Sequence, residues 1–192
     1  MDKPNGFLQR HPEKAEHNQY WYSAHTIGKI VEELTASASR IACLSTPSIY
    51  FSLPRGSPLR AAAWLLDYDE QWAADPHYVR YDFNAPELLP PHLHGAFDCV
   101  VIDPPFITRE VWDKYAQAAR LLLQPGGKVI ATTVAENAEL LAELLPAGEG
   151  GSRVQPAPFR PSIPHLIYQY NLFTNFHPAV LCQTNPEIPP DD

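Results

Sequence analysis

The sequence is poor in cysteine and has no long apolar run. Its 192 residues include 3 cysteines without the spacing of a metal site. Cys43 and Cys99 fall inside predicted strands, which is typical of buried free thiols in a reducing compartment. No apolar run approaches the roughly 20 residues that span a membrane. Residues 1–19 are polar and are interrupted by Pro4 and Pro12, so we expect neither a signal peptide nor a membrane anchor but a cytoplasmic protein.

Basic residues are also scarce. Lys and Arg number 14 against 22 Asp and Glu, the net charge is −8, and no Lys or Arg follows Arg160. Because a phosphate backbone is bound mainly through basic side chains, nucleic acid is disfavoured as a partner. An acidic chain is instead compatible with a basic protein partner.

A glycine-rich phosphate-binding loop is missing from the place where it would lie. The turn after the first predicted strand, residues 40–44, reads Ser45-Thr46-Pro47-Ser48, with neither a Walker lysine nor a Gly-x-Gly-x-x-Gly pattern. Cofactors that carry phosphate, such as NAD and ATP, are therefore disfavoured. S-adenosylmethionine has no phosphate, and small residues suffice to let its amino acid end approach.

The 21 prolines separate alternating predicted strands and helices. Strands are predicted over 40–44, 61–66, 77–81, 97–102 and 128–133, and helices after Ser23, briefly over 49–53, and over 109–123 and 136–145. Phe159 and the alternating segment 166–176 predict a closing antiparallel pair. This order predicts a doubly wound, mostly parallel α/β sheet with a C-terminal antiparallel hairpin. We expect a flexible arm over 1–17, a single domain over 18–183 and a disordered tail over 184–192.

Three successive predicted strands end at an acid, namely Asp67, Asp82 and Asp103. In a doubly wound sheet, the carboxyl ends of the strands line one crevice, so these acids should converge. An acid at the end of the second strand accepts the hydroxyl hydrogens of a ribose in nucleotide-binding folds, which favours Asp67 as the ribose ligand. Asp69 is the alternative ligand, or an exposed helix cap. Asp82 and Phe83 offer an acceptor for an adenine amine and a ring for the purine, or form a simple turn.

The tetrad Asp103-Pro104-Pro105-Phe106 follows a predicted strand whose last four residues, 99–102, are apolar. Two prolines fix φ and supply no N–H, so the carboxylate of Asp103 and the carbonyl of Pro104 lie beside an aromatic ring as acceptors. The plain alternative is a strand that ends in a proline turn with a surface aspartate. The tetrad resembles the motif with which amino-methyltransferases hold a target NH₂ group beside S-adenosylmethionine.

Five segments occur together in a characteristic order and spacing: Gln19-Tyr20-Trp21-Tyr22-Ser23, Cys43-Leu44-Ser45-Thr46-Pro47-Ser48, Leu66-Asp67-Tyr68-Asp69, Tyr81-Asp82-Phe83-Asn84 and Asp103-Pro104-Pro105-Phe106. Over roughly residues 18–178 the chain resembles the family of elongation factor 1-alpha lysine methyltransferases, first catalogued as adenine-specific methyltransferases. The resemblance implies a class I methyltransferase fold, S-adenosylmethionine as cofactor, and transfer of a methyl group to an amine.

The resemblance also implies a role for each matching residue. The catalytic group would be Asp103, Pro104, Pro105 and Phe106. The cofactor would contact Tyr22, Ser45, Thr46, Pro47, Asp67, Asp82 and Phe83, and the substrate would contact Tyr20, Trp21, Tyr168 and Tyr170. One ring of the Tyr20–Tyr22 run is expected instead to staple the following helix to the sheet. No metal is implied, since His92 and His94 lack a partner at ligand spacing.

Three functions fit these residues. The leading hypothesis is a monomeric protein-lysine methyltransferase that acts on elongation factor 1-alpha or a similar basic protein. The tetrad would equally accept the NH₂ group of a flipped adenine in RNA or DNA, so an adenine methyltransferase is the enzymatic alternative. A catalytically silent binding subunit is the third possibility, although intact Asp67 and Asp103 argue against it.

Overall fold

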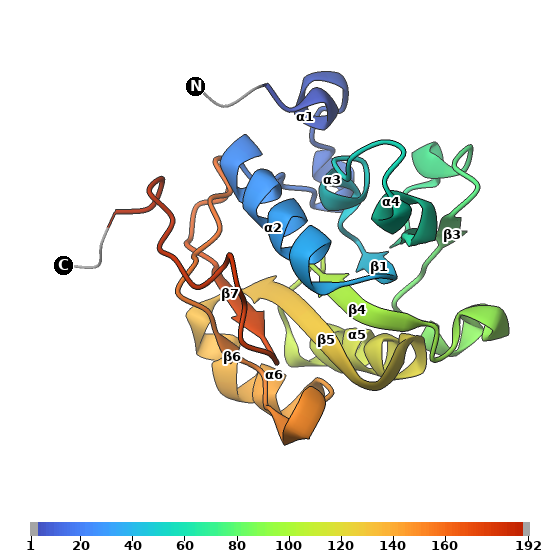
Figure 1. The fold of residues 1–192 in the computed structure, drawn as a ribbon. Coiled ribbons are helices and arrows are strands. Elements are labelled where there is room, and N and C mark those ends of the chain that lie inside the picture. Colours follow the sequence, from blue (N-terminus) through green and yellow to red (C-terminus); the bar gives the residue numbers. More distant parts are fainter. Residues whose placement is uncertain (1–3, 190–192) are drawn as a thin grey trace.

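The computed structural model describes residues 4–189, and a seven-stranded sheet forms the centre of that part of the chain (Figure 1). The strand order is β3-β2-β1-β4-β5-β7-β6. Strands β1 to β5 pair in parallel, whereas β7 is antiparallel to both β5 and β6. The predicted doubly wound sheet with a C-terminal antiparallel hairpin is confirmed. The strands are β1 (Ile41–Leu44), β2 (Trp64–Asp67), β3 (Tyr78–Arg80), β4 (Phe97–Ile102), β5 (Leu123–Thr133), β6 (Gln155–Pro156) and β7 (Asn171–Thr174).

Helices cover both faces of the sheet. In Figure 1, α1 (Gly6–Arg10), α2 (Ala24–Ser37), α3 (Pro47–Tyr50) and α4 (Pro58–Ala62) lie above it. On the other face lie α5 (Arg109–Leu122) and α6 (Ala138–Leu144). Short 3-10 turns occupy Ala15–His17, Glu70–Trp72, Pro86–Leu88, Pro91–Leu93, Ala135–Asn137 and Glu149–Gly151. Within residues 4–189, no helix combines the length and apolarity needed to cross a membrane.

The two faces of the central strands form two separate cores because successive side chains point to opposite sides. Leu44, Val100 and Ile102 pack on the α5 side. Cys43 and Cys99 pack on the α2 side, where both are fully buried and free, as the sequence predicts. Strands that are buried on both faces explain why these segments read as unbroken apolar runs.

Hydroxyl caps open α2 and α5. The hydroxyl of Ser23 accepts a hydrogen bond from the N–H of Thr26 and opens α2, as predicted. The Thr108 hydroxyl, which was not predicted as a cap, accepts from the N–H of Val111 and opens α5. The apolar stripe of α2, including Ile27, Ile30 and Leu34, is buried against the sheet.

Four predicted element boundaries are wrong. The strand predicted over 61–66 begins only at Trp64, because the Ser57 side chain caps α4 and Pro58 occupies its first turn. The helix predicted over 49–53 is a single turn at 47–50. Strand β5, predicted over 128–133, begins at Leu123, which pairs with Phe97 before a register shift. In the closing segment 166–176, only Asn171–Thr174 is a strand.

Both ends of the chain are more closely packed than predicted. Within the expected flexible arm 1–17, Phe7 of α1 is 2% exposed and its ring packs edge-on against Trp21. Within the expected disordered tail 184–192, Asn185 is buried and donates to the carbonyl of Arg160 at 2.8 Å. The remainder of both predictions, residues 1–3 and 190–192, lies outside the described part of the chain.

Candidate active site

The carboxyl ends of the parallel strands open into a cavity of about 450 Å³. The structure brings the acids at the end of β2 and after β3 and β4 into its wall, namely Asp67, Asp82 and Asp103. The wall is completed by segment 16–21 before α2 and by side chains between 163 and 170. This edge of an open α/β sheet is where ligands bind, and the size suits a small cofactor together with a side chain.

Asp103 is the partly buried acid at the end of β4. Its N–H donates to the carbonyl of Leu44 at 3.3 Å, and its Oδ1 accepts a hydrogen bond from the Thr132 hydroxyl at 2.9 Å. Burial raises the pKa of Asp103 to about 7, and the nearby Thr132 and Tyr22 hydroxyls oppose that rise. Asp103 is therefore a stronger proton acceptor than an ordinary aspartate, and it titrates near neutral pH.

The other members of the tetrad line the same cavity. Pro104 is buried, Pro105 is partly buried, and Phe106 is 51% exposed. The carbonyl of Pro105 accepts a hydrogen bond from the Asn18 side chain, which fixes segment 16–21 to the tetrad. The tetrad thus presents an acid, carbonyl groups and a ring at one wall, which is more than a surface proline turn.

Asp67 lies at the end of β2 with 6% of its surface exposed. Its Oδ1 accepts from the N–H of Asp69 at 2.8 Å. Burial raises its pKa to about 7, the Asp69 N–H opposes the rise, and the negative charge of Asp69 adds to it. A buried carboxylate in the cavity wall at this strand end fits the recognition of ribose hydroxyls.

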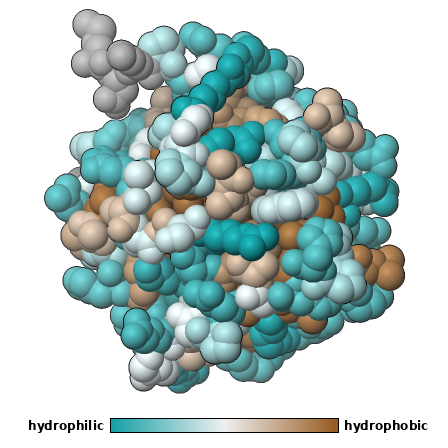
Figure 2. All heavy atoms as spheres, turned by 45° about the vertical axis from the view of Figure 1, so that its right-hand side comes forward, coloured by the Kyte–Doolittle hydropathy of each residue, from teal (hydrophilic) through white to brown (hydrophobic). Residues whose placement is uncertain are grey.

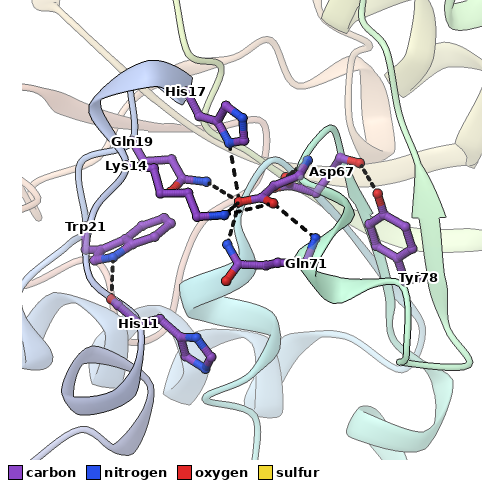
Figure 3. Close-up of polar contacts among 9 residues, drawn as sticks. His11, Lys14, His17, Gln19, Trp21, Asp67, Gln71 and Tyr78 are labelled. Atoms are coloured by element: carbon purple, nitrogen blue, oxygen red, sulfur yellow. Dashed lines mark hydrogen bonds and ion pairs between the residues drawn. The ribbon is translucent and has the colours of Figure 1, made fainter.

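Asp69 caps the 3-10 turn at Glu70–Trp72. Of the two predicted roles, ribose ligand and exposed helix cap, the cap is the one seen, but the side chain is buried. It accepts from the N–H of Gln71 at 3.1 Å and is only 5% exposed. Lys14, His17 and Gln19 reach its carboxylate from the N-terminal segment. Figure 3 labels these three side chains and draws the aspartate between them without a label. Burial alone would raise the pKa of Asp69, but hydrogen bonds from Lys14 and Gln71 lower it to about 2.

Asp82 and Phe83 form the predicted turn, and both also line the cavity. Asp82 Oδ1 accepts from the backbone N–H of Asn84 at 2.9 Å, which is a turn. Asp82 and Phe83 also line the cavity, where the Phe83 ring lies 6.0 Å from that of Tyr115. The turn therefore holds the pair in the cavity wall.

The turn after β1 is tight. Ser45 has φ of +55°, a conformation uncommon for a residue other than glycine, and its hydroxyl bonds that of Tyr115 at 2.6 Å. Ser45 and Pro47 line the cavity. Thr46, which the resemblance places against the cofactor, is 1% exposed and is not part of the cavity wall.

The predicted substrate-binding aromatics all line the cavity, and they differ in exposure. Tyr20 and Tyr168 are 38% and 52% exposed, whereas Trp21 and Tyr170 are nearly buried. Tyr22 differs from them, because it is 2% exposed and lies behind Asp103 rather than in the wall. Its hydroxyl bonds that of Thr132 at 2.6 Å. On the face seen in Figure 2, apolar side chains form small patches among polar ones.

Sequence reasoning missed Thr132, Tyr115 and Asn18. Thr132 had a readable signal, since it is a polar residue at the carboxyl end of a predicted buried strand next to the strand of Asp103. Tyr115 reads from sequence as a helix packing residue, and it does pack there. Asn18 depends on the fold of the N-terminal segment, where its φ is +50°.

The charge of the cavity is one-sided. Five carboxylic acids line it, and no Lys or Arg is found among the described residues of its wall. The acids are Glu16, Asp67, Asp69, Asp82 and Asp103. Such a wall favours a cationic ligand and opposes a phosphate group. No set of three His, Cys, Asp or Glu residues in the described chain could hold a metal ion.

Comparisons with known proteins agree with this geometry. The family described as "Probable N6-adenine methyltransferase" matches residues 13–178. EEF1A lysine methyltransferase 1 of Danio rerio is 37% identical over 136 residues, which cover 67% of this chain and 81% of the relative. A protein-lysine N-methyltransferase of Dictyostelium discoideum is 28% identical over 169 residues, 85% of this chain and 77% of the relative.

Solved structures show the same fold at low identity. A Streptococcus mutans protein assigned as a SAM-dependent methyltransferase gives a TM-score of 0.54 at 15% identity, over 82% of this chain and 49% of that one. SMU.776, assigned as a methyltransferase and solved with S-adenosylhomocysteine, gives 0.54 at 15% identity over 82% and 50%. This chain spans about half the length of each of these two. With the sheet order and the matched residues, these comparisons confirm the predicted resemblance: the chain belongs to the family of the EEF1A lysine methyltransferases, whose family description is probable N6-adenine methyltransferase.

Proposed function

We propose that this chain is an S-adenosylmethionine-dependent protein-lysine N-methyltransferase that acts on elongation factor 1-alpha. The observation that carries the proposal is the acidic cavity around Asp103, with no Lys or Arg in its described wall. The lysine side chain is a cation until it loses its proton, so the acidic cavity attracts it. The same negative charge attracts a basic protein. The named relatives act, by their names, on EEF1A or on protein lysine.

The cofactor site fits a nucleoside without phosphate. Asp67 would hold the ribose hydroxyls, Asp82 and Phe83 would hold the adenine, and Ser45 and Pro47 would face the methionine end. When bound, S-adenosylmethionine supplies an electrophilic methyl group on a sulfonium. Its positive charge suits a cavity that is rich in carboxylates.

The chain's own contribution to the reaction is to align and deprotonate the amine. In-line transfer needs the nitrogen lone pair about 3–3.5 Å from the methyl carbon. Asp103 and the carbonyl of Pro104 would orient the nitrogen, while Phe106 and Tyr20 would exclude water. A lysine, with an ordinary pKa near 10.4, must arrive neutral. The pKa of Asp103, raised to about 7, lies closer to the pKa of the lysine ammonium than that of an ordinary aspartate. A proton would therefore pass more readily from the lysine to Asp103.

An adenine in RNA or DNA is the second candidate, because the half-exposed ring of Phe106 could stack on a flipped base. The described wall of the same site has no Lys or Arg to bind the adjoining phosphates. Lysine is therefore the preferred acceptor, ahead of adenine. The protein is proposed to be a monomer in the cytoplasm, where buried free thiols such as Cys43 persist.

The test supplies methyl-labelled S-adenosylmethionine with elongation factor 1-alpha, total RNA or duplex DNA in separate reactions. We expect label in the protein only, and none with the Asp103→Asn variant. Label in RNA or DNA alone would establish the adenine activity instead. Cofactor binding without label in any acceptor would leave the silent subunit as the function.

A further inference from the structure

We propose that Thr132, held in turn by Tyr22, is a positioning residue that fixes the Asp103 carboxylate for the acceptor nitrogen. The inference rests on the proposed function, because it concerns the residue to which that function assigns the amine. It gives Tyr22 a different role from the cofactor contact that the sequence resemblance implies.

The hydrogen bonds between these three residues run in one direction. An ionised carboxylate only accepts, so the Thr132 hydroxyl must donate to Asp103 Oδ1 across 2.9 Å. The hydrogen of Thr132 is then committed, and the Tyr22 hydroxyl at 2.6 Å must be the donor to Thr132. Tyr22 and Thr132 therefore form a donor chain that ends on the acid.

The chain is rigid and dry. Tyr22 and Thr132 are 2% and 1% exposed, so water does not compete for their hydroxyls. Thr132 lies on β5, whose neighbour in the sheet is β4, the strand that carries Asp103 at its end. Tyr22 precedes the Ser23 cap of α2, and the N–H of Ser23 bonds the carbonyl of Ser162 at 2.8 Å. Three separate parts of the fold thus fix one oxygen of a carboxylate that lines the cavity.

Other ionisable groups face Asp103 as well. Three phenols lie near it: Tyr22 from the segment before α2, Tyr115 from α5, and Tyr170 from the residue before β7. Burial raises the pKa of all three, so they stay neutral around pH 7. Asp67 titrates near pH 7 too. A pH profile of activity would mix both acids, so a measurement that resolves Asp103 alone is required.

The test is a carbon-13 NMR titration of the Asp103 side chain in the full-length protein. Thr132→Val removes the donor and keeps the branched shape, so the pKa of Asp103 should rise by about one unit. Turnover should fall at least tenfold at neutral pH, whereas calorimetry should show unchanged affinity for S-adenosylmethionine. Thr132→Ser restores the hydroxyl. It should return the pKa of Asp103 to its wild-type value and turnover to within about twofold of wild type.

The matched control is Thr133→Val. Thr133 is the next residue of β5 and equally buried, and its hydroxyl accepts from Asn137 rather than touching Asp103. We expect the Asp103 titration of this variant to match wild type. A wild-type titration and turnover in Thr132→Val would overturn the proposal. Because the titration and the calorimetry use no acceptor, they stand even if elongation factor 1-alpha is not the substrate.

Tyr22→Phe is the second variant, in case Thr132→Val folds poorly. Loss of this phenol frees the Thr132 hydroxyl to turn, so the pKa of Asp103 should rise by less than in Thr132→Val and turnover should fall severalfold. Cofactor affinity should not change. If cofactor affinity falls and the titration does not move, Tyr22 is a cofactor ligand and the positioning role is refuted.

Discussion

The ammonium group of Lys14 lies 2.9 Å from the carboxylate of Asp69, so the N-terminal segment is tied to the loop that follows β2. Gln19 binds the same carboxylate, at 3.3 Å (Figure 3). Between these two residues, the side chain of Asn18 donates to the carbonyl of Pro105. Segment 14–19 therefore joins the cofactor side of the cavity to the tetrad side.

Lys14→Met should loosen this wall without unfolding the protein. The ion pair helps hold the pKa of Asp69 near 2, so its contribution to stability is present above about pH 4 and is lost as the pH falls toward 2. We expect a roughly 3–10-fold weaker affinity for S-adenosylmethionine by calorimetry at pH 7.5, the scale of one partly exposed ion pair. The control is Lys29→Met, which removes the Lys29–Glu32 pair on α2. Equal affinities in the two variants would show that the segment does not shape the site.

Asp67→Asn should have two opposite effects. A ribose ligand that loses its charge should weaken binding of S-adenosylmethionine by roughly 10–100-fold. The pKa of Asp67 is raised to about 7 from 3.8, so the charged form destabilises the fold as pH rises through 7. The variant without ligand should therefore melt at a higher temperature than wild type at pH 8, and the difference should vanish near pH 4. Unchanged affinity in a folded variant would move the ribose role to Asp69.

Asp103→Asn should separate binding from chemistry. The variant should keep cofactor affinity within about twofold and lose turnover by at least a hundredfold, because the carboxylate addresses the acceptor amine. In wild type, a rate at saturating cofactor should rise with pH through about 7, where Asp103 ionises. Single-turnover assays beside calorimetry measure both quantities. A parallel loss of binding and turnover would make Asp103 a cofactor ligand.

The sheet and its functional edge could be predicted because they depend on local signals. Buried parallel strands are apolar runs, and the runs that form β2 and the last part of β4 each end at an aspartate. The convergence of Asp67, Asp82 and Asp103 then follows from topology alone. The helix at 58–62 was misread because Ala61 and Ala62 fit either element, whereas the Ser57 cap and Pro58 decide it.

What the sequence could not show depends on contacts between distant segments. Phe7 and Leu8 are two apolar residues in a polar stretch, and the packing of Phe7 against Trp21 and Trp72 makes α1 part of the domain. Tyr22 lies in an aromatic run whose members look alike, and the entry angle of α2 decides that it points behind Asp103. Burial of Asp69 likewise depends on Lys14, which the fold brings from far along the chain.

The most direct measurement is peptide mapping by mass spectrometry of elongation factor 1-alpha after incubation with the enzyme and methyl-labelled S-adenosylmethionine between pH 7 and pH 9. The account predicts label on a lysine ε-amine, formed faster toward pH 9 because more free amine is present. Asp103→Asn should abolish that label at every pH. Label on adenine in accompanying RNA, with none on the protein, would contradict the account, because the acidic cavity would then have admitted a phosphate-linked base.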